Sequence, residues 1–122
     1  MKKLLTSRPP WIALGYLGIT LIATLSLLPA SFRPHSGLGG QYEHFIAYAL
    51  VGGALGLGYR TIRLQLISLL VLIAVAAMLE VLQNLIPGRN PELFGFLASS
   101  LGACFGLALV TSARAFLRAI AK

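Results

Sequence analysis

The stretch LISLLVLIAVAAMLE, residues 66–80, decides the fold, because it is an apolar run that ends in a carboxylate. Ser68 is the one polar residue before Glu80, and the mainly apolar segment around the run extends from position 64 to 86. A helix crosses the hydrocarbon core of a bilayer with about 20 residues. The stretch therefore predicts a membrane-spanning helix with an ionisable group near one end.

Three further apolar segments accompany this one, at about residues 11–28, 45–59 and 93–111. The 122-residue chain is 57% hydrophobic and 11% charged, whereas soluble domains carry roughly 25% charged residues. This composition excludes an ordinary soluble enzyme and a disordered chain. We expect one all-α domain over residues 1–122, an integral membrane four-helix bundle.

The basic residues indicate the orientation of the spans. With four spans, the N-terminus, the loop after the second span and the C-terminus share one side. Most of the ten basic residues belong to that side, namely Lys2, Lys3, Arg8, Arg60, Arg63, Arg114, Arg118 and Lys122. Arg33 and Arg89 belong to the other side. Because Lys and Arg are enriched in cytoplasmic loops, we expect both termini in the cytoplasm, and because the charges edge the spans we expect no nucleic-acid partner.

Residues 1–30 also resemble a secretory signal peptide, with a Lys-rich start and small residues near Ala30. The apolar run at residues 11–28 is long for that role. Cleavage would also leave three spans and put the termini on opposite sides. A first membrane span is the interpretation we favour.

Polar side chains recur inside the predicted spans, where they are costly and indicate function. Glu80, Gln83 and Asn84 are three and four residues apart, so they are expected on one helix face. His44 and Tyr48 have the i, i+4 spacing at the start of the second span. Two of the four predicted helices therefore carry polar groups that could meet.

The depth of these groups follows from the basic residues that flank each span. His44 is 16 residues from Arg60 and Glu80 is 17 from Arg63, which is roughly 24–26 Å at about 1.5 Å per residue. Thr24 and Ser99 are 16 and 15 residues from their own basic anchors, which is roughly 22–24 Å. All four helices thus offer a polar group at one level, near the side opposite the termini.

These groups predict a polar pocket that opens outward and binds a ligand. Its expected ligand-binding residues are His44, Tyr48, Glu80, Gln83, Arg89 and Ser99. Arg89 would reach down from the short loop above and present a fork of donors to an anionic group. In the alternative interpretation, Glu80 pairs with His44 or Arg89 only to fasten the bundle.

Metal, cofactor and covalent chemistry find little support in the sequence. It has no HExxH, CxxC, Walker or GxSxG pattern. His44 and Glu80, with Glu92 as a further acid, fall short of a typical zinc site. Ser99 or Ser100 could serve as a nucleophile with His44 as base, but no local motif supports it. We expect no catalytic residue, no metal and no cofactor.

Small residues predict close helix packing. Gly52 and Gly56 form a GxxxG pattern in the second span, and Gly102 and Gly106 form another in the fourth. Such faces can pack within one chain or between copies of it. A homo-oligomer through these glycine-rich faces is therefore an open alternative.

The stretches EHFIAYALVGGALG (43–56) and LEVLQNLIPGRNPELFGFLASSLGACFG (79–106) resemble the VanZ-like family of small bacterial membrane proteins. That family has a His-Phe pair with a following Tyr, then Glu-x-x-Gln, a Pro-Gly-Arg turn and an Asp…Asn-x-x-Gly entry to the last helix. The matching positions, within roughly residues 20–110, are His44, Phe45, Tyr48, Glu80, Gln83, Pro87, Gly88, Arg89, Gly102 and Gly106.

The chain departs from the family pattern at Gly40, Gln41, Gly95 and Ser99, where the family has Asp, Lys, Asp and Asn. Glu43 or Glu92 is a candidate to compensate. The family is named for a protein linked to low-level resistance to glycopeptide antibiotics, teicoplanin in particular. The resemblance implies a multi-pass protein of the bacterial cytoplasmic (inner) membrane. Its implied partners are membrane lipids or lipid-linked cell-envelope intermediates at the outer leaflet.

The function we expect is that of a cell-envelope protein whose pocket binds a lipid head group or amphiphile without catalysis. The rival is a membrane enzyme acting on a lipid-linked phosphate or ester, with Glu80 or His44 as general base. A proton-coupled carrier is a third hypothesis, since Glu80 and His44 can hold protons. Four short helices without paired half-helices make the carrier less attractive.

Overall fold

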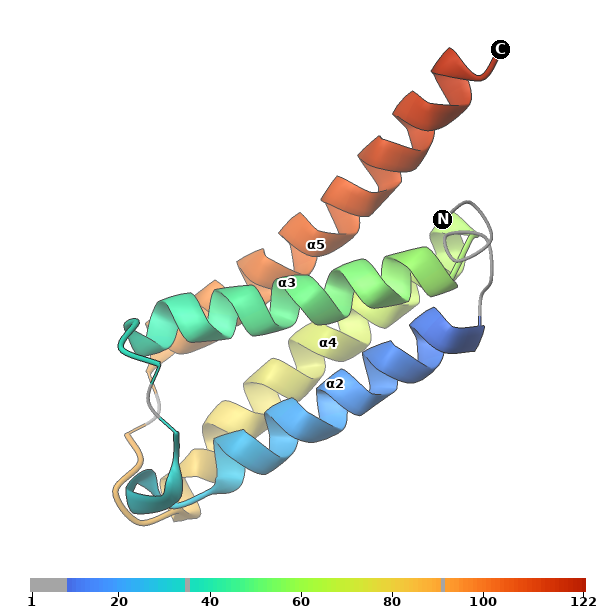
Figure 1. Cartoon of the computed structure of the whole chain (residues 1–122). Coiled ribbons are helices and arrows are strands. Elements are labelled where there is room, and N and C mark those ends of the chain that lie inside the picture. The colour runs from blue at the N-terminus through green and yellow to red at the C-terminus, as the bar shows by residue number, and fades with distance from the viewer. Residues whose placement is uncertain (1–8, 35, 91) are drawn as a thin grey trace.

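The computed structural model describes residues 9–34, 36–90 and 92–122, and it is shown in Figure 1. These residues form four α-helices and no strand, so the predicted all-α fold is confirmed. The helices are α2 (Pro9–Leu27), α3 (Gly40–Gly58), α4 (Ile62–Leu82) and α5 (Leu93–Ile120), with 3₁₀ turns η1 (Ala30–Phe32) and η2 (Gln83–Leu85). Lys2, Lys3 and Arg8, which the orientation argument uses, lie outside the described residues.

Helix α3 is the centre of the bundle and packs most extensively against α5. Their backbones touch at glycines: a Cβ atom at Gly52 would lie 2.6 Å from the Ala103 carbonyl oxygen, and one at Gly102 would overlap the Phe45 carbonyl. Close approach of this kind needs residues without side chains. The glycine-rich faces are therefore used between α3 and α5 within one chain.

Helix α2 packs on another side of α3, again through small residues. Side chains from α3 fill the space beside two glycines of α2, Val51 against Gly18 and Leu55 against Gly15. The buried core is small and consists of Tyr48, Val51, Leu55, Leu72, Ala76 and Ala103. Most apolar side chains consequently remain on the outside.

The outer surface has the character of a membrane protein. The segments Pro9–Leu27, Ile62–Leu85 and Leu93–Ile120 are long and apolar enough to cross a bilayer, yet only 17%, 22% and 33%, respectively, of an apolar 18-residue stretch in each is buried. Large apolar side chains such as Leu17 and Leu70, each 65% exposed, cover the outside. An aqueous protein does not expose apolar surface on this scale. Helix α3 is less apolar because its first turn, GQYEH, is polar.

Three helix ends differ from the predicted spans. Helix α3 begins at Gly40, five residues before the predicted position 45, and so includes that polar turn. Helix α4 ends at Leu82, where the chain tightens into η2. Helix α5 continues to Ile120 instead of ending near 111; its 28 residues span about 42 Å, against about 30 Å of hydrocarbon. Figure 1 shows its C-terminal part extending past the other helices.

The two ends of the bundle differ in charge. At one end α2 and α4 finish while α3 and α5 begin, and the three acidic residues of the chain, Glu43, Glu80 and Glu92, lie there. We call this the cavity end. At the opposite end, the basic end, α2 begins and α3 gives way to α4, and its described basic residues are Arg60, Arg63, Arg114, Arg118 and Lys122.

Candidate functional site

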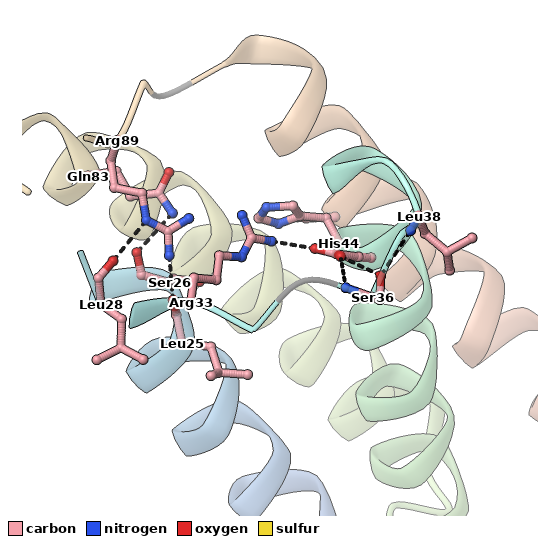
Figure 2. A network of polar contacts seen from close by, with 11 residues as sticks. Leu25, Ser26, Leu28, Arg33, Ser36, Leu38, His44, Gln83 and Arg89 are labelled. Carbon is pink, nitrogen blue, oxygen red and sulfur yellow. Dashed lines mark hydrogen bonds and ion pairs between the residues drawn. The ribbon is translucent and has the colours of Figure 1, made fainter. Parts of the chain in front are cut away.

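The Pro-Gly-Arg turn places Arg89 over the end of α2. Gly88 has φ +75°, a left-handed conformation that glycine adopts without strain, and the turn brings Arg89 back to the bundle. Arg89 Nε donates a hydrogen bond to the Leu28 carbonyl oxygen at 2.9 Å, and its Nη2 donates to the Leu25 carbonyl oxygen at 2.6 Å (Figure 2). The last carbonyls of a helix lack partners within it and favour a cation. Arg89 is thus a C-cap of α2.

Gln83 completes this cap. Its side chain is 5% exposed, and Nε2 donates to the Ser26 carbonyl oxygen at 3.1 Å (Figure 2). The expectation that Thr24 represents α2 in the polar layer is wrong. The Thr24 hydroxyl is exposed and donates to the Thr20 carbonyl of its own helix. Helix α2 contributes backbone carbonyls to the polar layer instead of a hydroxyl.

Glu80 lies against the start of α5. Its Oε2 accepts a hydrogen bond at 3.1 Å from the backbone N–H of Glu92, the residue that precedes the helix. A carboxylate at this place is favoured by the helix dipole. A Cβ atom at residue 95 would lie 2.9 Å from Glu80 Oε1, so Gly95 leaves the space that the carboxylate uses.

The pairings expected of Glu80 are not made. Within the described part of the chain the one ion pair joins Arg33 to Glu43, and none joins Glu80 to His44 or Arg89. Asn84, predicted on the same face as Glu80, is exposed, and its side chain donates to the Val81 carbonyl oxygen. Asn84 nevertheless lies on the side of Glu80 as predicted, because both residues line one shallow surface depression together with Glu92.

His44 is held in one orientation by Ser99. The Ser99 Oγ atom lies 3.2 Å from His44 Nδ1 and donates to the Gly95 carbonyl oxygen at 2.9 Å. When the one hydroxyl hydrogen of Ser99 is directed to Gly95, His44 Nδ1–H donates to Ser99 Oγ, which leaves Nε2 of a neutral ring with its lone pair. Ser99 itself is 1% exposed and lines neither of the two cavities described below, so its contact in this structure is with His44.

Two residues outside the predicted set tie the loop after α2 to α3. Arg33 Nη2 lies 2.6 Å from Glu43 Oε2 in the ion pair, and the Ser36 hydroxyl donates to Glu43 Oε1 at 2.5 Å. The sequence offered a signal for both. Arg33 is one of two basic residues assigned to the side away from the termini, and Glu43 is one of three acids in the chain.

Two adjoining cavities, of about 310 and 390 Å³, open at the cavity end and share Arg33, His44, Gln83 and Arg89. The first also has an apolar wall from α2 and α3, formed by Ile22, Leu25, Ala47 and the ring of Tyr48. The second is more polar and includes Glu80, Asn90, Glu92 and Gly95. Volumes of this size suit small ligands. The structure thus brings five of the six predicted residues to the cavities, with Ser99 directly behind His44.

Several polar groups on these walls remain available. Tyr48 is 2% exposed, lines the first cavity, and its hydroxyl has no hydrogen-bond partner among the described residues. Arg89 uses Nε and one nitrogen of its fork on α2, so Nη1 can still donate. Burial, and after it the nearby Arg33 guanidinium, lowers the pKa of Arg89. An anion beside Arg89 would offset both effects, because it favours the charged guanidinium.

Comparisons and metal geometry point to no known chemistry. No family model, curated protein or solved structure matches this chain. Within the described ranges, no three His, Cys, Asp or Glu side chains gather as metal ligands would. The chemistry of the cavity walls is therefore what indicates the function.

Proposed function

We propose that this chain is a four-span membrane protein whose cavity end binds the anionic head group of a lipid or similar amphiphile. The observation that carries the proposal is the pairing of two cavities around Arg33, His44 and Arg89, one of which has an apolar wall. An amphiphile needs both, a polar site for its head and an apolar surface for the start of its chain.

The proposed orientation puts the cavity end outside the cytoplasm and the basic end inside. The arginines of the basic end support this, because cytoplasmic loops are rich in Lys and Arg. Helix α3 serves as the fourth span. Its polar first turn lies at the mouth of the cavity, and its apolar part, from Phe45 to Gly58, packs against the other three helices.

The chemistry of the walls favours a phosphate-bearing head group. Arg33 and Arg89 supply guanidinium donors, the Tyr48 hydroxyl supplies a neutral donor, and His44 Nε2 accepts a hydrogen bond from a hydroxyl or amine of the head group. The VanZ-like resemblance supports a lipid-linked envelope intermediate of the bacterial cytoplasmic membrane as the ligand.

Tyr48→Phe tests this proposal with little disturbance, because the ring keeps its packing and only the free hydroxyl is lost. Lipids retained by the detergent-purified protein are identified by native mass spectrometry. We expect occupancy to fall about tenfold, as for loss of a hydrogen bond to a charged group. Tyr16→Phe, at the basic end, is the matched control and should keep wild-type occupancy. Equal occupancy in Tyr48→Phe and wild type would contradict the proposal.

A lipid-modifying enzyme is the second candidate, and the orientation of His44 favours it. With Nδ1 held by Ser99, Nε2 is the nitrogen left to take a proton from a substrate hydroxyl or water. The test is product formation from polyprenyl phosphates and phospholipids. Turnover that is present in wild type and absent in His44→Ala would establish catalysis, whereas lipid retention without turnover would leave binding as the function.

A further inference from the structure

A third hollow, of about 530 Å³, lies on the outer face of α3, between α2 and α5. Its walls are apolar, and the six residues that matter most are Trp11 and Leu14 of α2, Gly53 and Leu57 of α3, and Leu109 and Val110 of α5. We call it the α3 groove. It shares no lining residue with the two cavities at the cavity end. It is thus a separate feature, on the apolar outside of the bundle.

The α3 groove leads toward the basic end. Trp11 stands near the start of α2, and Leu57 lies beside the last residue of α3. On α5, Arg114 and Arg118 follow Val110 by one and two helical turns, so they continue the same helix face. A molecule lying in the groove would have its end among these arginines.

The Arg114 side chain is held by hydrogen bonds to α3, whereas the Arg118 side chain is exposed. Arg114 Nη1 donates to the Gly56 carbonyl oxygen at 2.5 Å and Nη2 donates to the Leu57 carbonyl, which caps the C-terminus of α3. Arg118 is exposed one turn further on, and it and Arg60 act electrostatically on Arg114. Three like charges therefore gather where the groove ends.

No carboxylate side chain balances this cluster. The three acidic residues of the chain all lie at the cavity end. Along the extension of α5, Arg118 and Lys122 share one face, while Phe116 and Ile120, 65% and 64% exposed, occupy the opposite one. A helix with a basic and an apolar face is typical of the interface between hydrocarbon and anionic head groups.

We propose that the α3 groove and the basic end form a binding site for one anionic phospholipid, independent of the ligand at the cavity end. One acyl chain lies in the groove, and the phosphate rests on Arg118, next to the positive charges of Arg114 and Arg60. A zwitterionic lipid would fill the groove equally well but would bring no net charge to the arginines. A second copy of the chain would place its own basic end beside this one, since both copies cross the membrane in the same direction, and the arginines would repel.

The test measures lipid bound to the intact, detergent-purified chain by native mass spectrometry. Phosphatidylglycerol and phosphatidylcholine with identical acyl chains are offered at equal concentration. We expect one phosphatidylglycerol to be retained in preference to phosphatidylcholine. Arg118→Gln should weaken phosphatidylglycerol about fivefold, the effect of one cation near a membrane surface. Arg63→Gln removes the same charge at the same end, at a residue that does not flank Arg114, and should have no such effect.

A second pair of variants tests the groove without changing charge. Gly53→Leu fills it, and a Cβ atom there would meet its nearest neighbours at 3.7 Å, an ordinary contact, so the backbone is not forced apart. Ala74→Leu, on the exposed outer face of α4, is the control. Circular dichroism verifies that each variant is folded. The one tryptophan, Trp11, lines the groove and should be quenched more by phosphatidylglycerol with brominated chains than by the phosphatidylcholine analogue.

Each outcome decides the matter. The site is supported if phosphatidylglycerol binding is weaker in Arg118→Gln and in folded Gly53→Leu while both control variants bind it as wild type does. Equal retention of the two lipids, or undiminished retention in folded Gly53→Leu, overturns it. A two-chain mass in wild type that disappears in Gly53→Leu would also overturn it, because a second copy would then cover the groove. Tyr48→Phe changes a different cavity, so failure of either proposal leaves the other standing.

Discussion

The carboxylate of Glu80 occupies the space that a side chain at residue 95 would need: a Cβ on Gly95 would lie 2.9 Å from Glu80 Oε1. The same carboxylate accepts the Glu92 N–H at the start of α5. The end of α4 thus contacts the beginning of α5 through the Glu80 carboxylate, which fits there because Gly95 has no side chain. The site at the cavity end depends on this junction, because Ser99 and Gly95 belong to the first turns of α5.

Gly95→Ala should therefore destabilise the protein by displacing Glu80 from its cap. We expect a loss of about 1–2 kcal/mol in the free energy of unfolding, the usual value of a helix N-cap. In a Glu80→Ala background the cost should vanish and turn into a gain of about 0.5 kcal/mol, since alanine favours a helix over glycine. Denaturation of the four proteins in mixed micelles measures both terms. Additive effects would show that the two residues do not interact.

Arg89→Lys should weaken the end of α2 although it keeps the positive charge. Lysine cannot reach the Leu25 and Leu28 carbonyls with two fixed donors as the guanidinium does. We expect about 1–2 kcal/mol lower stability, and a greater loss in Arg89→Ala. Arg63→Lys, at an exposed position at the start of α4, should be neutral. Protection of the α2 amides in hydrogen exchange would locate the effect, and unchanged exchange there would contradict it.

Ser99→Ala should release the tautomer of His44. In wild type the contact with Ser99 favours the tautomer that carries the proton on Nδ1, and Ser99→Ala removes that contact. Nitrogen-15 spectra of histidine-labelled protein distinguish the two ring nitrogens. The chain has two histidines, so His35→Gln identifies the His44 signals. Identical nitrogen shifts in wild type and Ser99→Ala would show that Ser99 does not orient the ring.

Gly102→Ala should separate α3 from α5. The added methyl group would overlap the Phe45 backbone carbonyl, which cannot move without moving α3. Overpacking of this kind costs about 1–3 kcal/mol. Gly40→Ala is the matched control, because no atom lies within 4 Å of a Cβ placed there. Equal stability of the two variants would mean that the glycine contact does not hold the helices together.

Sequence patterns predicted the level of the site better than its contacts. Counting residues from the basic anchors placed His44 and Glu80 at one end, and the structure has both there, because helical rise is regular enough to carry depth along a span. Thr24 failed under the same arithmetic, since depth does not say which face of a helix a residue occupies. The spacing of Glu80 and Asn84 predicted a shared side correctly, since both line one surface depression, although the α-helix itself ends at Leu82.

The partners of Arg89 and Gln83 could not be predicted at all. Both side chains bind backbone carbonyls at the end of α2. Every residue has a backbone carbonyl, so the sequence does not indicate which one a side chain will bind. The glycine at 95 was misleading for a related reason. As a departure from the VanZ-like pattern it suggested a lost polar group, whereas in the structure it leaves room for Glu80.

The cap on α2 has a consequence for how the protein is made. Gln83 and Arg89 reach Ser26 and Leu25 across 57 and 64 positions of the chain. These carbonyls of α2 can therefore receive their side-chain partners only after α4 and the turn that follows it have been synthesised. The cavity walls that Arg89 lines are completed in the same step, so a nascent chain that stops before residue 89 contains α2, α3 and α4 but lacks part of the proposed binding site.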